Sequence, residues 1–407
     1  MEESSRFAVG IDIGTKNVRA VLGSVGRDGK MTVVGYAETP SAGMRRGSVV
    51  DMNAVADAVD VCLKDVEVMS GRRIDVGTMS INGTSIMSTK VDGMITILPD
   101  QEVDDECINR LQEMSIAGKL PLNRKVLDLH PFEYILDGQH GIREPFGMRG
   151  SRLELRANVV SVMKPEYDNL LKSQDGADFA DLGVATAVMA AAQAVLTKQQ
   201  MENGIAVVDL GSATTSVAVY DAGELQYVGV IPMGSNDITK DLAMVLRTIP
   251  EIAEEIKLRF ASASFGREDK EFSIKHDRID HKFSYSKVDE VIEARLEEIF
   301  EKVRLHLKQA GYAKRLPEGI MLTGGGAKMR DIDVYAREQL ELAVRIGKPG
   351  IMLANEINEI LKPEFATAIG LMIIDAGSGA QKGTPVSLSK NKKSGGGFFS
   401  KFAGMFK

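Results

Sequence analysis

Apolar and polar positions near the N-terminus follow a pattern that predicts a β-hairpin. An apolar run at residues 7–11 leads to Asp12, Gly14 and Thr15, and a second apolar run follows at residues 18–22. Short β-forming runs on both sides of a small polar turn are typical of a hairpin. The side chains available for chemistry therefore lie at the polar tip.

The same pattern returns in the second half of the chain. The apolar run 205–208 precedes Asp209 and Gly211, and another apolar run, 217–220, follows a stretch of small hydroxyl residues. Two distant copies of Asp-x-Gly between β-forming runs indicate a duplicated domain.

Other segments predict strands and helices that surround these hairpins. The strand 320–322 enters a glycine-rich junction with a following helix, and the apolar run 182–196 predicts a buried helix. That run is shorter than the roughly 20 residues that a membrane-spanning helix needs. A long helix is predicted over 286–312, with its apolar stripe at Val288, Val291, Ile292, Leu296, Ile299, Val303 and Leu307. A further helical stripe consists of Val55, Val59, Cys62 and Val66.

Composition narrows the class of protein. The chain has 407 residues, which favours two lobes or domains, and its formal net charge of -7 argues against a nucleic-acid-binding body. Cys62 and Cys107 are far apart and fit a reducing compartment without a disulfide framework or a zinc site. The N-terminal residues lack the pattern of a signal peptide, so we expect a cytoplasmic body.

The hairpin tips have the chemistry of a phosphate site. Glycines allow close approach of the backbone, and amide and hydroxyl groups can surround phosphate oxygens. The predicted ATP- and phosphate-binding residues are Asp12, Gly14, Thr15, Lys16, Asp209, Gly211, Ser212, Thr214 and Thr215. Asp12 and Asp209 are also expected to hold Mg²⁺, through its waters, and Arg19 is a second cationic candidate beside Lys16.

Two further segments are candidates for contact with adenosine. Gly324, Gly325 and Gly326 lie where a strand meets a helix and offer bare backbone to a flat ligand. Glu254 and Lys257 share a helix face, where they reach adenine or ribose or form a solvated ion pair with each other. We identify no catalytic residue.

In this order, the two Asp-x-Gly loops, the junction 323–327 and the segment 365–376 resemble the actin-like ATPase superfamily. A narrower resemblance, to the FtsA family of bacterial cell-division proteins, covers about residues 6–376 and the C-terminal tail. Its most specific part consists of His130, Pro131, Tyr134, Asp137, Gly138, Gln139, Gly141, Ile142, Pro145, Gly147, Met148 and Gly150. The resemblance implies an α/β, two-lobed actin-like fold, ribonuclease-H-like and duplicated, with an FtsA-type inserted subdomain in the first lobe.

The resemblance and the composition together predict eight segments. The first-lobe core occupies 1–83 and 163–203, on either side of an inserted interaction subdomain at 84–162. The second-lobe core occupies 204–233, with the second phosphate loop, and 313–376, with the adenosine loop and the last helix; an outer subdomain lies at 234–312. A flexible linker, 377–397, and a membrane-targeting helix, 398–407, complete the chain.

Two departures from the family pattern concern hydrolysis. The second loop has Ser212, Ala213 and Ser216 where relatives usually carry two glycines and an aspartate. Ala187 and Val188 stand where relatives often carry Glu-Pro, whose carboxylate helps to position the attacking water. Because a water without a nearby base reacts roughly 10²- to 10⁴-fold more slowly, we expect binding of Mg-ATP with slow hydrolysis or none.

The resemblance also implies protein partners. In the FtsA family the inserted subdomain serves self-association and contact with later division proteins, and the outer subdomain receives the C-terminal peptide of the tubulin-like protein FtsZ. By motif match, Arg295 and Glu298 are the predicted FtsZ contact; the alternative is a simple ion pair between them. We expect a filament of this chain and no nucleic-acid partner.

The tail predicts a peripheral membrane anchor. Large side chains follow helical spacing behind a linker rich in glycine, serine and lysine. The predicted membrane residues are Phe398, Phe399, Lys401, Phe402, Met405 and Phe406. Such a cationic, aromatic amphipathic helix binds an anionic lipid surface. Together with the resemblance to the FtsA family, it implies the cytoplasmic side of the cell membrane at the division site. The alternatives are a disordered end or docking on the protein's own body.

Competing functions remain within the same superfamily. A small-molecule kinase would need an aspartate base in a substrate pocket and has no use for the tail. A pilus-assembly or chaperone relative would share the ATP core. The segment 130–142 argues against both.

Overall fold

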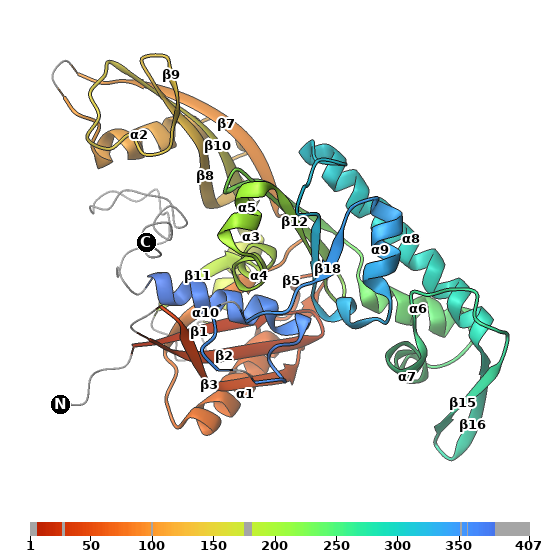
Figure 1. The fold of residues 1–407 in the computed structure, drawn as a ribbon. Helices are drawn as coiled ribbons and strands as arrows, with labels where there is room; N and C mark the ends of the chain where they lie inside the picture. The colour runs from red at the N-terminus through yellow and green to blue at the C-terminus, as the bar shows by residue number, and fades with distance from the viewer. Residues whose placement is uncertain are drawn as a thin grey trace.

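A computed structural model describes residues 6–26, 29–98, 101–174, 181–350, 352–355 and 357–378. A five-stranded sheet forms the core of the first lobe (Figure 1), in the order β11-β6-β1-β2-β3. Its strands are β1 (Arg6–Ile13), β2 (Asn17–Val25), β3 (Met31–Pro40), β6 (Val76–Ile81) and β11 (Asp181–Thr186). The strands β1, β2 and β3 are antiparallel neighbours, whereas β6 is parallel to β1 and β11 is parallel to β6. The predicted hairpin at β1 and β2 is confirmed.

Helix α1 (Met52–Ser70) covers part of this sheet and contacts β2 and β3. The Asp51 side chain accepts a hydrogen bond from the Ala54 N–H at its start, and Gly71 ends it at φ 67°. Its predicted apolar stripe is confirmed, because the four side chains named above are fully buried. The two-stranded ladder of β4 (Met44–Arg45) and β5 (Ser48–Val49) precedes it.

The prediction of one buried helix over 182–196 is wrong. The first part of this run belongs to β11, in parallel register with β6 from Asp181 opposite Val76 to Thr186 opposite Ile81. Only α4 (Ala187–Val195) is helical. A short apolar run suits a buried strand as well as a buried helix, and pairing with β6 decides the outcome.

Helices α4 and α10 (Ala366–Ser378) connect the two lobes, and α10 packs against both α4 and β1. A Cβ added to Gly370 would lie 1.7 Å from the Ala190 carbonyl oxygen, and one added to Gly10 would lie 2.0 Å from the Ala368 carbonyl oxygen. The backbones therefore approach too closely for any other residue at these two positions. Helix α10 therefore packs closely on both α4 and β1.

A nine-stranded sheet continues from the second lobe into the inserted segment, in the order β18-β17-β12-β13-β14-β7-β10-β8-β9. The strands of the second lobe are β12 (Ile205–Leu210), β13 (Thr215–Asp221), β14 (Glu224–Ile231), β17 (Ile320–Thr323) and β18 (Val344–Ile346). Those of the insert are β7 (Met87–Thr96), β8 (Arg124–Leu136), β9 (Gln139–Ile142) and β10 (Arg152–Met163), with α2 (Asp105–Ile116) on one face. The junction of β14 and β7 has one register pair, Gly229 opposite Met87.

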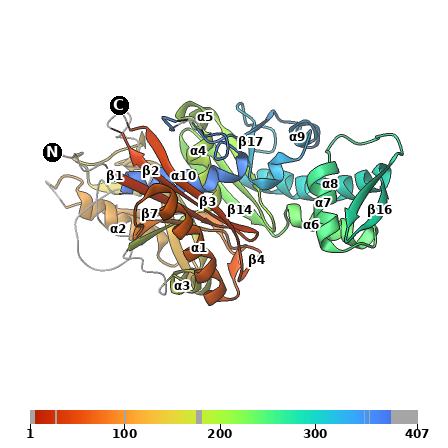
Figure 2. The ribbon, with the colours of Figure 1, turned by 90° about the horizontal axis from the view of Figure 1, so that it is seen from below.

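The outer part of the second lobe is mainly helical and lies at one end of the molecule, away from α1 and α2 (Figure 2). It contains α6 (Ser235–Val245), α7 (Pro250–Phe260), α8 (Tyr285–Ala310) and the hairpin of β15 (Glu271–His276) and β16 (Ile279–Ser284). The apolar stripe predicted for α8 is buried and therefore confirmed. The remaining helices are α3 (Lys164–Lys172), α5 (Lys198–Asn203), α9 (Ile332–Leu340), η1 (Gly325–Lys328) and η2 (Pro363–Phe365).

Part of the sequence-based scheme stays a prediction. The eight segment boundaries are untested, and the tail residues Phe398, Phe399, Lys401, Phe402, Met405 and Phe406 lie outside the described residues. Within the described ranges, none of the helices combines the length and the hydropathy that crossing a bilayer requires.

Candidate functional site

The tip of the first hairpin is a tight loop between β1 and β2. Asp12 lies opposite Arg19 in the ladder, and the Gly14 N–H donates a hydrogen bond to the Asn17 carbonyl oxygen at 3.1 Å. The Thr15 hydroxyl oxygen accepts a hydrogen bond from the Gly47 N–H at 3.1 Å. The loop is thus tied to its own strand and to the β4–β5 ladder.

The second hairpin repeats this geometry. Asp209 lies opposite Ser216, and the Gly211 N–H donates to the Thr214 carbonyl oxygen at 3.0 Å. Each loop therefore places an aspartate at the strand end and closes with the same glycine-to-third-residue hydrogen bond. The duplication inferred from the sequence is confirmed at the level of individual hydrogen bonds.

The two aspartates interact electrostatically across the lobes. Asp12 is buried and accepts a hydrogen bond from the Ser80 hydroxyl at 2.9 Å. Burial raises the pKa of Asp12. Burial, followed by the nearby charge of Asp12, raises the pKa of Asp209 to about 7, and Arg19 opposes this shift. A buried carboxylate at Asp12 and a partly buried one at Asp209, on which the charge of Asp12 acts, fit a hard divalent cation.

No cluster of three or more His, Cys, Asp or Glu side chains that could hold a metal occurs among the described residues. The tips of the two hairpins offer one aspartate each, Asp12 and Asp209. Because a two-carboxylate site leaves most coordination positions to water, it suits Mg²⁺, which usually retains several waters.

The charge of Arg19 acts on both aspartates. It opposes the rise in the pKa of Asp12 and in that of Asp209. The Arg19 Nε lies 2.7 Å from Glu38 Oε2, and its guanidinium lies over the Phe365 ring. The sequence pointed to Arg19 but not to Glu38 or Ser80, because β3 and β6 come beside the loop only through sheet pairing.

The second loop packs on the start of α6. The carbonyl oxygens of Gly211 and Ser212 accept hydrogen bonds from the N–H groups of Ser235 and Asn236, at 2.9 and 2.7 Å. Thr215 is fully buried, and its hydroxyl donates to the Met233 carbonyl oxygen at 2.8 Å. The Thr215 hydroxyl therefore already holds the loop; Thr214 is also buried, whereas Ser212 is only partly buried.

The glycine-rich junction lies directly beside the second aspartate. Gly324 has φ 84°, and a Cβ there would lie 2.2 Å from Asp209 Oδ1. A Cβ at Gly326 would meet the Leu210 side chain, whereas nothing lies within 4 Å of one at Gly325. The backbone at Gly325 is thus open to a ligand next to the aspartate pair.

Glu254 and Lys257 of α7 are brought together, 2.7 Å apart. The Thr239 hydroxyl donates to Glu254 Oε2 at 2.5 Å, and Lys16 forms an ion pair with Glu254 Oε1. Burial alone would raise the pKa of Glu254, but Lys16, Lys257 and Thr239 lower it to about 2. Glu254 and Lys257 thus form the ion pair that the sequence offered as an alternative to a ligand contact. The pair is not solvated, however, because the Lys257 side chain is only 9% exposed.

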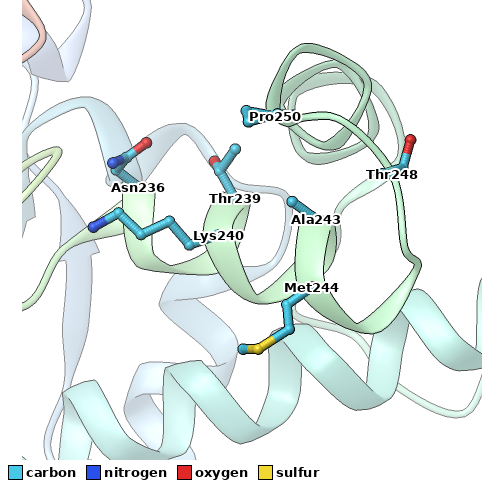
Figure 3. Close-up of a pocket in the computed structure, with 7 residues that line it drawn as sticks. All are labelled: Asn236, Thr239, Lys240, Ala243, Met244, Thr248 and Pro250. Atoms are coloured by element: carbon cyan, nitrogen blue, oxygen red, sulfur yellow. The ribbon is translucent and has the colours of Figure 1, made fainter.

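A hollow lies between α6 and α7 (Figure 3). Its lining residues are Asn236, Thr239, Lys240, Ala243, Met244, Thr248 and Pro250. Thr239 links the hollow to Glu254, and Met244 is largely exposed. This hollow could not be predicted from the sequence, because its walls form only when α6 and α7 pack side by side.

Arg295 of α8 pairs with Glu298 at 2.5 Å and also with Asp241 of α6 at 2.6 Å. The neighbour on the same helix was predictable from its spacing. Asp241 was not, because it lies 54 positions away in sequence.

Solved structures share this fold. The chain is similar to the structure described as "PilM-PilN type IV pilus biogenesis complex" (TM-score 0.66, 18% identity, 91% of this chain and 98% of that chain). It is also similar to MreB5 of Spiroplasma citri bound to ADP (TM-score 0.55, 14% identity, 91% and 96%). A third similar structure is the "MamK double helical filament" (TM-score 0.51, 13% identity, 90% and 98%).

The duplicated hairpins, the two sheets and the pair of central helices thus define an actin-like ATPase fold, as predicted. The family model "Cell division protein FtsA" matches residues 206–370, and "SHS2 domain inserted in FTSA" matches residues 83–161. Cell division protein FtsA of Neisseria meningitidis is 36% identical over 377 residues, 91% of each chain. That of Pseudomonas aeruginosa is 33% identical over 376 residues, 91% of this chain and 89% of the other.

This chain belongs to the FtsA family of cell-division proteins. The insert in its first lobe is the SHS2 domain of that family.

Proposed function

We propose that this chain binds Mg-ATP between its two lobes. The observation that carries the proposal is the pair of matching hairpin loops, each with an aspartate at its strand end, where the charge of Asp12 helps to raise the pKa of Asp209. The phosphates lie on these loops, and Asp12 and Asp209 hold the Mg²⁺ through its waters. Adenosine lies between the glycine-rich junction, Gly324 to Gly326, and the α7 pair of Glu254 and Lys257. When bound, Mg²⁺ neutralises phosphate and carboxylate charge.

Hydrolysis is slow or absent in this proposal. The first turn of α4 contains no acidic residue, and its N-cap residue, Thr186, makes no side-chain capping hydrogen bond. A water near the phosphates would therefore find no carboxylate on this helix. Nucleotide then acts mainly by binding and by holding the lobes in a defined arrangement.

At the level of the cell, the proposed role is structural. The chain assembles into filaments, binds the C-terminal peptide of FtsZ through the outer subdomain and recruits later division proteins through the insert. The tail attaches the filament to the inner face of the cell membrane at the division site. FtsA family membership supports this role over a small-molecule kinase, and the MamK structure is an example of a filament built from this fold.

The nucleotide part of the proposal is tested with Asp209→Asn. Removing the Asp209 carboxylate should raise the midpoint of thermal unfolding by a few degrees without nucleotide, because its desolvation and the repulsive effect of the Asp12 charge on it disappear. The same change should weaken Mg-dependent ATP binding by at least about tenfold. Differential scanning fluorimetry with and without Mg-ATP measures both effects.

Ser216→Ala provides the matched control, since Ser216 lies opposite Asp209 in the same ladder. A variant at Asp209 that is still stabilised by Mg-ATP to the same extent as the unmodified chain would contradict the assigned site.

A further inference from the structure

Lys16 and Glu254 join the two lobes directly. Lys16 lies at the tip of the β1–β2 hairpin in the first lobe, and Glu254 lies on α7 in the outer part of the second lobe, 238 positions later in sequence. Their side chains form an ion pair at the edge of the candidate nucleotide site.

The second-lobe end of this pair is rigid. The other carboxylate oxygen of Glu254 receives the Thr239 hydroxyl at 2.5 Å and lies 2.7 Å from Lys257 Nζ. Lys257 is itself almost fully buried and donates to the Ser235 carbonyl oxygen at 3.2 Å. Glu254 therefore cannot follow Lys16 without breaking bonds to both α6 and its own helix.

The first-lobe end is anchored through its backbone. The Lys16 carbonyl oxygen accepts a hydrogen bond from the Ser41 N–H at 2.9 Å, and the adjacent loop is closed by the bond between Gly14 and Asn17. The Lys16 side chain is about half exposed and spans the remaining distance. Separation of the lobes must therefore break the contact of Lys16 with Glu254.

We propose that Lys16 and Glu254 form a clasp across the cleft that limits how fast nucleotide enters and leaves. The inference rests on the proposed nucleotide site and adds a regulatory role for one residue pair. In solution, an exposed ion pair adds only a small free energy. Here, however, both partners are held by their own lobes, so the pair resists opening.

The test is stopped-flow exchange of a fluorescent ATP analogue on the full chain and on Lys16→Met, with Lys16→Arg as the charge-preserving control. If nucleotide passes only through the open form, loss of the clasp should raise the association and dissociation rates together, by about two- to fivefold. An increase in the association rate is the distinguishing readout, because loss of a phosphate ligand would not speed association, and Lys16→Arg exchanges at the rate of the unmodified chain.

Increasing salt provides a second kinetic readout. Salt screens exposed charge pairs, so exchange by the unmodified chain should accelerate from 0.05 to 0.5 M salt more than exchange by Lys16→Met. A third readout is small-angle scattering without nucleotide, in which Lys16→Met should show a larger radius of gyration.

The outcomes are distinguishable. Unchanged exchange rates in a folded Lys16→Met variant overturn the clasp. Faster dissociation alone, with a matching loss of affinity, also overturns it, because Lys16 would then be a simple phosphate ligand. Failure of the unmodified chain to bind the analogue would instead contradict the proposed function.

Discussion

At the scale of single residues, the two hairpin aspartates have equivalent positions but different surroundings. Asp12 and Asp209 have equivalent places in two hairpins, and each is followed by a glycine that closes the loop. Only Asp209 has a glycine of the third motif, Gly324, pressed against its carboxylate. The two halves have therefore diverged: the first aspartate is supported by Ser80 and the second by close backbone packing.

A buried histidine at the junction between the insert and the second lobe predicts a pH effect. His130 of β8 lies 3.2 Å from Asp128, and Glu224 of β14 also acts on it. Burial alone would lower the pKa of His130, but Asp128 and Glu224 raise it above its ordinary value. A raised histidine pKa stabilises the fold below about pH 6.5, and this stabilisation is lost as pH rises through the folded-state pKa.

We therefore expect His130→Asn to remove part of the decline in stability as the pH rises above about 6.5. The variant should also be less stable at pH 6 by about 1 kcal/mol or more, because Asp128 loses its charged partner. Urea unfolding at a series of pH values measures both. His140→Asn, on an exposed side chain of the insert, provides the matched control. An equal slope in His130→Asn and the unmodified chain would contradict this assignment.

At the scale of elements, the insert and the second lobe share one sheet. Besides the pair of Gly229 and Met87, Ser88 Oγ accepts a hydrogen bond from the Val228 N–H at 2.9 Å, and Asn158 donates to the Leu225 carbonyl oxygen at 3.2 Å. At this junction, hydrogen bonds between side chains of β7 and β10 and the backbone of β14 thus stand in for part of the backbone ladder between strands. The insert belongs to the first lobe by sequence position and to the second lobe by hydrogen bonding.

The proposed contact with FtsZ on α8 gives a prediction about binding of the FtsZ peptide. Arg295→Glu should weaken binding of the acidic FtsZ C-terminal peptide by at least about tenfold, because a carboxylate replaces the cation among Asp241 and Glu298. Glu298→Gln should instead strengthen binding, since it frees one side of the Arg295 guanidinium. Fluorescence anisotropy with a labelled peptide measures both variants.

The control for this pair is Lys302→Glu, further along α8, which should change the affinity little. Unchanged binding by Arg295→Glu, with folding verified by circular dichroism, would remove Arg295 from the proposed contact.

At the scale of the whole molecule, the tail and the filament depend on each other. Burying five large apolar side chains contributes roughly 1.5–3 kcal/mol each, whereas ordering ten residues costs about 1–2 kcal/mol each. In the proposed function, one tail would therefore bind lipid weakly, and a filament that presents many tails would bind firmly through effective concentration.

Deletion of residues 398–407 should abolish co-sedimentation with anionic liposomes in the presence of ATP and leave ATP binding unchanged. Phe402→Ala should reduce sedimentation partially, because one side chain of the apolar stripe is lost. Electron microscopy on lipid monolayers shows whether filaments form without the tail. Continued sedimentation of the truncated chain would indicate another membrane-binding surface.

From the sequence alone, the features that depend on short-range patterns were predictable. Hairpins around Asp12 and Asp209, the stripe of α8 and the glycine-rich junction each lie within one local segment, where residue spacing determines the element. Family motifs supplied the order of these elements and hence the fold class. The prediction of one helix over 182–196 was wrong because an apolar run does not show whether a strand will pair with it. Here the first part of the run pairs with β6 and forms β11.

Contacts between distant segments were decided only by the tertiary structure. Arg19 with Glu38, Arg295 with Asp241 and Lys16 with Glu254 each join side chains that no local spacing relates. Charged side chains accept many partners of opposite sign, so their pairing depends on which backbones the fold brings within reach. For the same reason, the sequence indicated the chemistry of the cleft, whereas the folded chain determined which groups face one another across it.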